Sequence, residues 1–168
     1  MKRLLIVVAV LWGLLPVAGL AQAQGQAADI SPDKLQVINC VENLQSDADW
    51  DQCLALMFEP CSGVEVGSEP HVACLRDQRE SWRTVFDGQY LTLTEELTVV
   101  GITELATILG QWTGYVGNQC SQVAQGKPEG QADAAQYGCE ISEIVGVSAE
   151  LYACRAGLST APYCQLKE

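Results

Sequence analysis

The sequence has little of what metal sites and nucleic-acid surfaces are built from. Its 168 residues include a single histidine, His71, which excludes any site made of several histidines. Only nine lysines and arginines stand against 21 aspartates and glutamates, for a net charge of -12. A sequence-independent nucleic-acid binder needs a basic surface, and an anionic membrane repels an acidic chain. The composition therefore disfavours nucleic acid and anionic lipid as partners.

Signatures of catalysis are also missing. The chain has no C-x-x-C pair, no closely spaced zinc ligands, no G-x-S-x-G or H-E-x-x-H motif and no glycine-rich phosphate loop. His71 follows Pro70 at an expected helix start, where a capping or surface role suits it. We therefore expect no catalytic, cofactor-binding or metal-binding residues, and no enzymatic activity.

The first residues have the pattern of a secretory signal peptide. Two basic residues, Lys2 and Arg3, precede an apolar run, and an A-x-A site ends at Ala23. This pattern predicts a signal peptide over 1–23 that is cleaved after Ala23. The small and polar residues over 24–30 are then a flexible lead.

An uncleaved membrane anchor is the alternative interpretation of this segment. The apolar run is about long enough to span a bilayer, but Pro16 and Gly19 interrupt it and favour cleavage. The first cysteine is Cys40, so no lipid-bearing cysteine follows the cleavage site. We expect a periplasmic or secreted protein with no stable membrane insertion after cleavage.

Two short helices are expected next, as a Cys-bearing hairpin over 31–60. Ser31, Pro32 and Asp33 combine a capping hydroxyl, a proline at the first helical position and an acid in the first turn. A second helix begins at Ser46 or Asp47. The apolar positions at helical spacing are Leu35, Ile38, Val41 and Leu44, then Trp50, Cys53, Leu54, Met57 and Phe58.

Longer helices are expected over 70–100, 103–123 and 131–157. Residues 91–100 also suit a strand, and Gly101 is the expected break. The positions at helical spacing are Leu75, Trp82, Phe86, Leu93, Leu97 and Val100, then Thr103, Leu105, Ile108, Leu109, Trp112, Tyr115, Val116, Gln119 and Val123, and last, facing inward, Ala135, Ile141, Ile144, Val147, Leu151 and Cys154. No strand pair is needed, so the predicted class is all-α, a small disulfide-stapled bundle of four to five helices.

The eight cysteines follow the predicted signal peptide, and export places them in an oxidising space as four disulfides. Each short turn or loop between helices is flanked by two of them, which brings such pairs face to face. The most local pairing is Cys40–Cys53, Cys61–Cys74, Cys120–Cys139 and Cys154–Cys164. The main competitor pairs the first four as Cys40–Cys61 and Cys53–Cys74.

Three elements follow one another over residues 61–151. They are Cys61…Cys74…Trp82 with the turn F-D-G-Q-Y ending at Tyr90, W-T-G-Y from Trp112 to Tyr115 before Cys120, and Cys139 with Glu150-Leu151 beyond it. In their order and spacing these elements resemble the LprI-type lysozyme-inhibitor family of exported helical domains. The resemblance implies an LprI-like helical domain with a Cys-bearing tail over 61–168. It also implies that Trp82, Tyr90, Trp112 and Tyr115 shape the fold.

The chain departs from that family at charged positions. Val116 and Gly117 stand where the family usually has an arginine and an acid, Val147 stands where it has an arginine, and Asp87 replaces an asparagine. The ion pairs expected between the last two helices are thus replaced by apolar contact. Such an exchange preserves a fold at little cost.

The resemblance implies binding of a cationic protein such as lysozyme. The alternative is a structural or assembly module of the cell envelope with no inhibitory activity. The expected contact residues are Asp47, Asp49, Asp51, Glu59, Glu65 and Glu69. Acids are also favoured at helix N-termini and on solvated loops, which explains the same residues without a partner.

Overall fold

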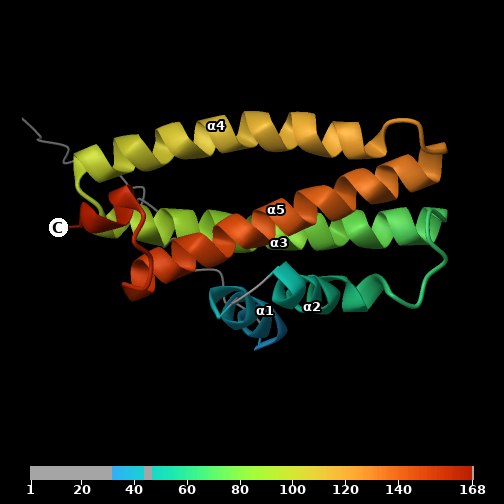
Figure 1. The fold of residues 1–168 in the computed structure, drawn as a ribbon, viewed down its shortest axis with the longest axis horizontal. Coiled ribbons are helices and arrows are strands. Elements are labelled where there is room, and N and C mark those ends of the chain that lie inside the picture. The colour runs from blue at the N-terminus through green and yellow to red at the C-terminus, as the bar shows by residue number, and fades with distance from the viewer. Residues whose placement is uncertain (1–31, 44–46, 168) are drawn as a thin grey trace, which may run out of the picture.

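The computed structural model describes residues 32–43 and 47–167 and shows an all-α bundle (Figure 1). Its elements are α1 (Pro32–Glu42), α2 (Asp47–Phe58), a 3-10 turn η1 (Glu59–Cys61), α3 (Glu69–Glu96), α4 (Val99–Ala124), α5 (Glu129–Ala156) and a second 3-10 turn η2 (Pro162–Gln165). The predicted class is confirmed. The predicted signal peptide and flexible lead lie outside the described residues.

The three long helices run along the length of the molecule, and α5 runs obliquely across α3 from the end where it follows α4 (Figure 1). Helix α5 packs on α3, on α4 and on the short helix α1, while α2 packs on α1 and α5. The α1–α2 hairpin therefore covers the side of the bundle away from α4. Over the residues that the structure describes, no helix combines the length and apolarity needed to cross a membrane.

Two apolar clusters hold these helices together. The larger joins α1, α2, α3 and α5 through Ile38, Met57, Trp82, Ile141 and Val145. The smaller joins the other end of α3 to α4, α5 and the tail, through residues Leu93, Leu97, Leu105, Leu151, Cys154 and Tyr163. The predicted hairpin thus shares a core with the longer helices.

The helix boundaries follow from local capping. Ser68 accepts a hydrogen bond from His71 N at the start of α3, and Thr98 accepts one from Gly101 N at the start of α4. The predicted break at Gly101 is therefore wrong, because the chain turns at Leu97 and Thr98 and Gly101 lies in the first turn of α4. A Cβ there would come within 3.1 Å of Leu166, so the glycine lets the tail pack on α4. Gly157, at φ 73°, closes α5 as predicted.

The structure corrects several predicted inward positions. Tyr115 is 56% exposed, and Val116 takes the buried position beside it. Val100, Ile108 and, on α1, Leu35 also lie exposed. On α4 these side chains are exposed because the helix packs mainly on α5, along one side. Only a narrow arc of its surface is therefore covered. Of the four aromatic residues expected to shape the fold, Trp82 is buried, and Tyr90 and Trp112 are half-buried. Tyr115 is the exception, because its exposure keeps it out of the core.

All eight cysteines are paired, and the pairing is the local one. The structure contains Cys40–Cys53, Cys61–Cys74, Cys120–Cys139 and Cys154–Cys164, and it excludes the crossed alternative for the first four. The first joins α1 to α2, the third joins α4 to α5, and the last ties the tail to α5. Cross-links of this kind are typical of proteins that fold in an oxidising compartment.

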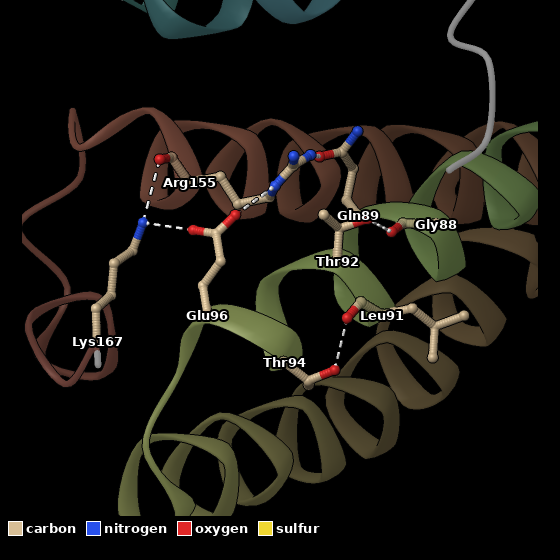
Figure 2. Close-up of polar contacts among 8 residues, drawn as sticks. All are labelled: Gly88, Gln89, Leu91, Thr92, Thr94, Glu96, Arg155 and Lys167. Atoms are coloured by element: carbon tan, nitrogen blue, oxygen red, sulfur yellow. Dashed lines mark hydrogen bonds and ion pairs between the residues drawn. The ribbon is translucent and has the colours of Figure 1, made fainter. Parts of the chain in front are cut away.

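A polar network fastens the C-terminal tail to the bundle. Glu96, at the end of α3, accepts hydrogen bonds from Arg155 Nε at 3.3 Å and from Lys167 Nζ at 2.9 Å. Arg155 also donates to the buried Gln89 Oε1 at 2.8 Å, and Lys167 donates to the Arg155 carbonyl at 3.1 Å (Figure 2). The hydrogen bond from Lys167, opposed by burial and assisted by Arg155, lowers the pKa of Glu96.

We expect Glu96→Gln to destabilise the fold by about 1 kcal/mol at neutral pH, because it removes the charge that pairs with Arg155 and Lys167. The loss stays small because Glu96 is partly exposed and solvent screens its ion pairs. Its lowered folded-state pKa means that the stabilisation is fully present above the unfolded pKa and is lost as pH falls through the folded pKa. Urea unfolding at neutral and at acidic pH measures this. The gap between wild type and variant should close in acid. Glu95→Gln, exposed and outside the network, is the control; an equal loss there would contradict the prediction.

Candidate functional site

Three of the predicted contact residues gather at one end of the bundle. Glu59 lies in η1, Glu65 lies in the loop over 62–68, and Glu69 begins α3. All three are exposed. In Figure 1 this is the end where the chain passes from α2 to α3 and, beside it, turns from α4 into α5.

The loop over 62–68 is pressed against the first turn of α5. A Cβ on Gly130 would collide with the Gly67 carbonyl, and a Cβ on Gly67 would meet Gln131 Cγ at 2.9 Å. Gly67, at φ 81°, has a backbone conformation that favours glycine. Its N–H donates to His71 Nδ1 at 3.2 Å, so the one histidine holds the loop in place.

The docked loop brings two further acids to this end, Glu129 and Asp133 in the first turns of α5. Both are exposed. They lie more than sixty residues along the chain from Glu65, and sequence spacing alone did not associate them. The second glycine of the QGKPEG segment, Gly130, was the one available signal, because it permits the close approach of the Gly67 carbonyl. We call this group the acidic end: Glu59, Glu65, Glu69, Glu129 and Asp133.

A hollow of about 440 Å³ opens at the acidic end. Phe58, Leu75 and Ala134 give it an apolar floor, while Glu59 and His71 supply polar groups. Phe58 reaches α5 here, since a Cβ on Gly138 would lie 3.9 Å from its ring. The hollow combines an apolar surface with carboxylates nearby, which suits the apolar stem and charged tip of a lysine or arginine.

Little positive charge balances the acidic end. None of its five carboxylates takes part in an ion pair within the described structure. Lys127, in the adjoining turn, is the single basic residue between Arg83 and Arg155. The ion pairs that are present lie elsewhere, from Arg79 to Glu80 and Glu140, and from Glu96 to Arg155 and Lys167. Arg76, next to Leu75 on α3, is exposed and also outside these ion pairs. The five carboxylates of the acidic end therefore outnumber Lys127 and Arg76, the basic residues nearest to it along the chain.

The remaining predicted contacts do not join this site. Asp49 and Asp51 lie in the first half of α2, and the helical rise of about 1.5 Å per residue puts them about 15 and 12 Å along the axis from Glu59. Asp51 is exposed and Asp49 is half-buried. The side chain of Asp47 lies outside the described residues. Trp50, predicted to be core, is half-buried and packs 3.6 Å from the Cβ position of Gly146.

Gly130→Ala is expected to displace the 62–68 loop, because the added methyl group meets the Gly67 carbonyl. We expect a loss of about 1–3 kcal/mol in the free energy of unfolding, which is typical of overpacking. Gly110→Ala is the matched control, since nothing lies within 4 Å of that Cβ. That variant should gain up to about 1 kcal/mol from helix propensity. Urea denaturation of both measures this, and a stabilised Gly130→Ala would show that the loop is not docked.

No group of three or more histidine, cysteine or acidic side chains in the described ranges is placed to hold a metal ion. Two valines stand where the LprI-type pattern has arginines: Val116 is buried on α4, and Val147 is half-buried on α5. The ion pairs between long helices join α3 to α5 in the described residues.

Comparison of the chain with known protein families, curated proteins and solved structures finds no match in any of the three.

Proposed function

We propose that the protein is an exported binding module whose acidic end docks on a cationic protein. The observation that carries the proposal is the hollow at the acidic end, which has an apolar floor and Glu59 in its lining, with four more exposed carboxylates at the same end of the bundle. A basic side chain of the partner buries its stem on Phe58 and Leu75 and keeps its charge near those carboxylates. The contact is thus both apolar and electrostatic.

Electrostatics supports the same partner class. A chain with a net charge of -12 attracts a cationic protein from a distance and raises the association rate, an effect that falls with ionic strength. The apolar hollow adds a contribution that salt screens much less. A real docking site is therefore expected to keep binding at physiological salt, whereas unspecific attraction is not.

Export is supported by the leader pattern and the four disulfides. The disulfides fit an oxidising compartment, and the predicted cleavage after Ala23 would leave all eight cysteines in the mature chain. Periplasmic or secreted location is part of this proposal. Among cationic proteins of such compartments, lysozyme is the one that the family resemblance names.

The test is a lysozyme activity titration with the oxidised protein, at low and at physiological salt. A chicken-type and a goose-type enzyme should both be used, with reduced and alkylated protein as a control. We expect stoichiometric inhibition of one type that survives physiological salt and is lost on reduction. Inhibition at low salt alone would mean generic charge attraction, and no inhibition of either enzyme would overturn lysozyme as the partner.

A charge variant locates the contact. The triple change Glu59→Gln, Glu65→Gln and Glu69→Gln removes charge from the acidic end while keeping side-chain size. We expect it to weaken binding of the cationic protein and to reduce its salt dependence. Asp51→Asn is the control, because Asp51 is exposed in the first half of α2 and outside the lining of the hollow. Equal effects of the two variants would contradict docking at the acidic end.

A second candidate function, an assembly module of the envelope, is favoured by the outer face of α4. This 26-residue helix has one charged residue, Glu104, and carries several exposed apolar side chains: Val99, Val100, Ile108, Tyr115 and Val123. A helix face with exposed apolar side chains and the single charge of Glu104, on an acidic protein, suits an assembly contact. Light scattering over a concentration series tests it: wild type should assemble where Ile108→Lys does not, and a wild-type monomer with no envelope partner would contradict this candidate.

A further inference from the structure

A second cleft, of about 320 Å³, lies where α3, α4 and α5 meet. It shares no residue with the hollow at the acidic end. Helix α3 lines it with Arg79, Arg83 and Asp87, and α4 lines it with Trp112 and Gly117. A Cβ on Gly117 would have no neighbour within 4 Å, so this side of the cleft is open. The volume is at the lower end of the range for small-ligand sites.

One wall of the cleft is aromatic. The rings of Phe86 on α3 and Trp112 on α4 lie with centroids 5.8 Å apart and planes inclined by 31°. Both side chains are half-buried, and both line the cleft. This pair offers an apolar surface to a ligand on the open side, and the buried Val116 and Ile144 extend it.

The guanidinium of Arg79 is held in place at the edge of the cleft. Arg79 gives one terminal nitrogen to Glu140 at 3.0 Å and the other to Glu80 at 2.8 Å. Its Nε is buried and has no hydrogen-bond partner. The guanidinium also lies over the Tyr137 ring, with Cζ 4.7 Å from the ring centroid. The buried Nε is therefore closed to a ligand, and the polar groups that the cleft offers to one are those of the exposed Arg83 and Asp87.

The charges of the lining balance each other. Two guanidinium groups, Arg79 and Arg83, stand with two carboxylates, Asp87 and Glu140. Arg83 and Asp87 are exposed and enter no ion pair within the described part of the chain. A balanced lining gives no preference to a net cation, and the negative charge of the whole chain opposes an anion. An uncharged ligand with several hydrogen-bonding groups fits this lining.

We propose that the cleft binds an uncharged saccharide. A sugar ring has an apolar face that lies against the Phe86–Trp112 wall and hydroxyl groups that both donate and accept hydrogen bonds. These hydroxyls pair with Arg83 and Asp87, whose planar groups each offer two atoms to a ligand.

The test uses a glycan array with the oxidised protein, covering neutral hexose, pentose and N-acetylhexosamine oligosaccharides beside sialylated and sulfated ones. We expect saturable binding of a neutral glycan, accompanied by a change in tryptophan fluorescence from Trp112. No binding of any neutral glycan would overturn the proposal. Binding confined to sialylated or sulfated glycans would overturn it as well.

A blocking variant ties any binding to the cleft. Gly117→Leu places a side chain in the open space, and we expect it to weaken glycan binding about tenfold or more. The change replaces an exposed helical glycine, so the melting temperature should hold or rise. Gly110→Leu is the matched control, on the same helix, with an open Cβ position and outside the cleft lining. Equal binding by the two variants would place the glycan elsewhere and overturn the proposal.

Discussion

Reduction of the four disulfides is expected to unfold the protein. The bridges close loops with sequence separations of 10 to 19 residues. By the chain-entropy account, each contributes about 2–4 kcal/mol. Four of them together match the whole stability of an ordinary domain, about 5–15 kcal/mol. Circular dichroism of reduced and alkylated protein should show little helix and no cooperative thermal transition.

A single-bridge variant provides the graded comparison. The double change Cys120→Ala and Cys139→Ala opens the link between α4 and α5, the bridge with the largest sequence separation. We expect a loss of about 3 kcal/mol, with the helical fold retained. If the fully reduced protein still melted cooperatively with native helix content, the apolar clusters alone would be sufficient and the prediction would be wrong.

Trp82→Ala is expected to have the largest effect of any single substitution. Trp82 is 1% exposed in the cluster that joins α1, α2, α3 and α5, and Lys34 Nζ lies 5.5 Å from its ring centroid. Removing a buried tryptophan leaves a cavity that rigid helices fill poorly. The free energy of unfolding should fall by about 3–5 kcal/mol. Urea denaturation with a constant m-value measures it.

Trp112→Ala is the matched control for Trp82→Ala. Trp112 is half-buried at the cleft between α3 and α4, so its truncation leaves less cavity and exposes less apolar surface. We expect a loss of about 1–2 kcal/mol. Losses of equal size in the two variants would show that the core does not centre on Trp82.

Local signals in the sequence predicted the all-α class and the helices to within a few residues. The 3.6-residue period, the capping residues and the loop residues act over one or two turns, so they need no tertiary information. The disulfide pairing belongs to the same group, because each bridge spans one turn or short loop. The prediction of a break at Gly101 was wrong for two reasons. Thr98 provides a stronger local signal for the start of a helix. Gly101 serves a tertiary contact, because it lets Leu166 of the tail pack on α4.

The candidate sites depended on long-range packing. Glu129 and Asp133 join Glu65 at the acidic end because the Gly67 loop docks on Gly130, a contact between segments distant in the chain. Tyr115 and Ile108 have the spacing of buried residues, yet they are exposed because α4 packs on α5 along one narrow arc. Periodicity shows which residues share a helix face. The neighbours in the folded chain decide whether that face is covered, and they alone create the hollow and the cleft.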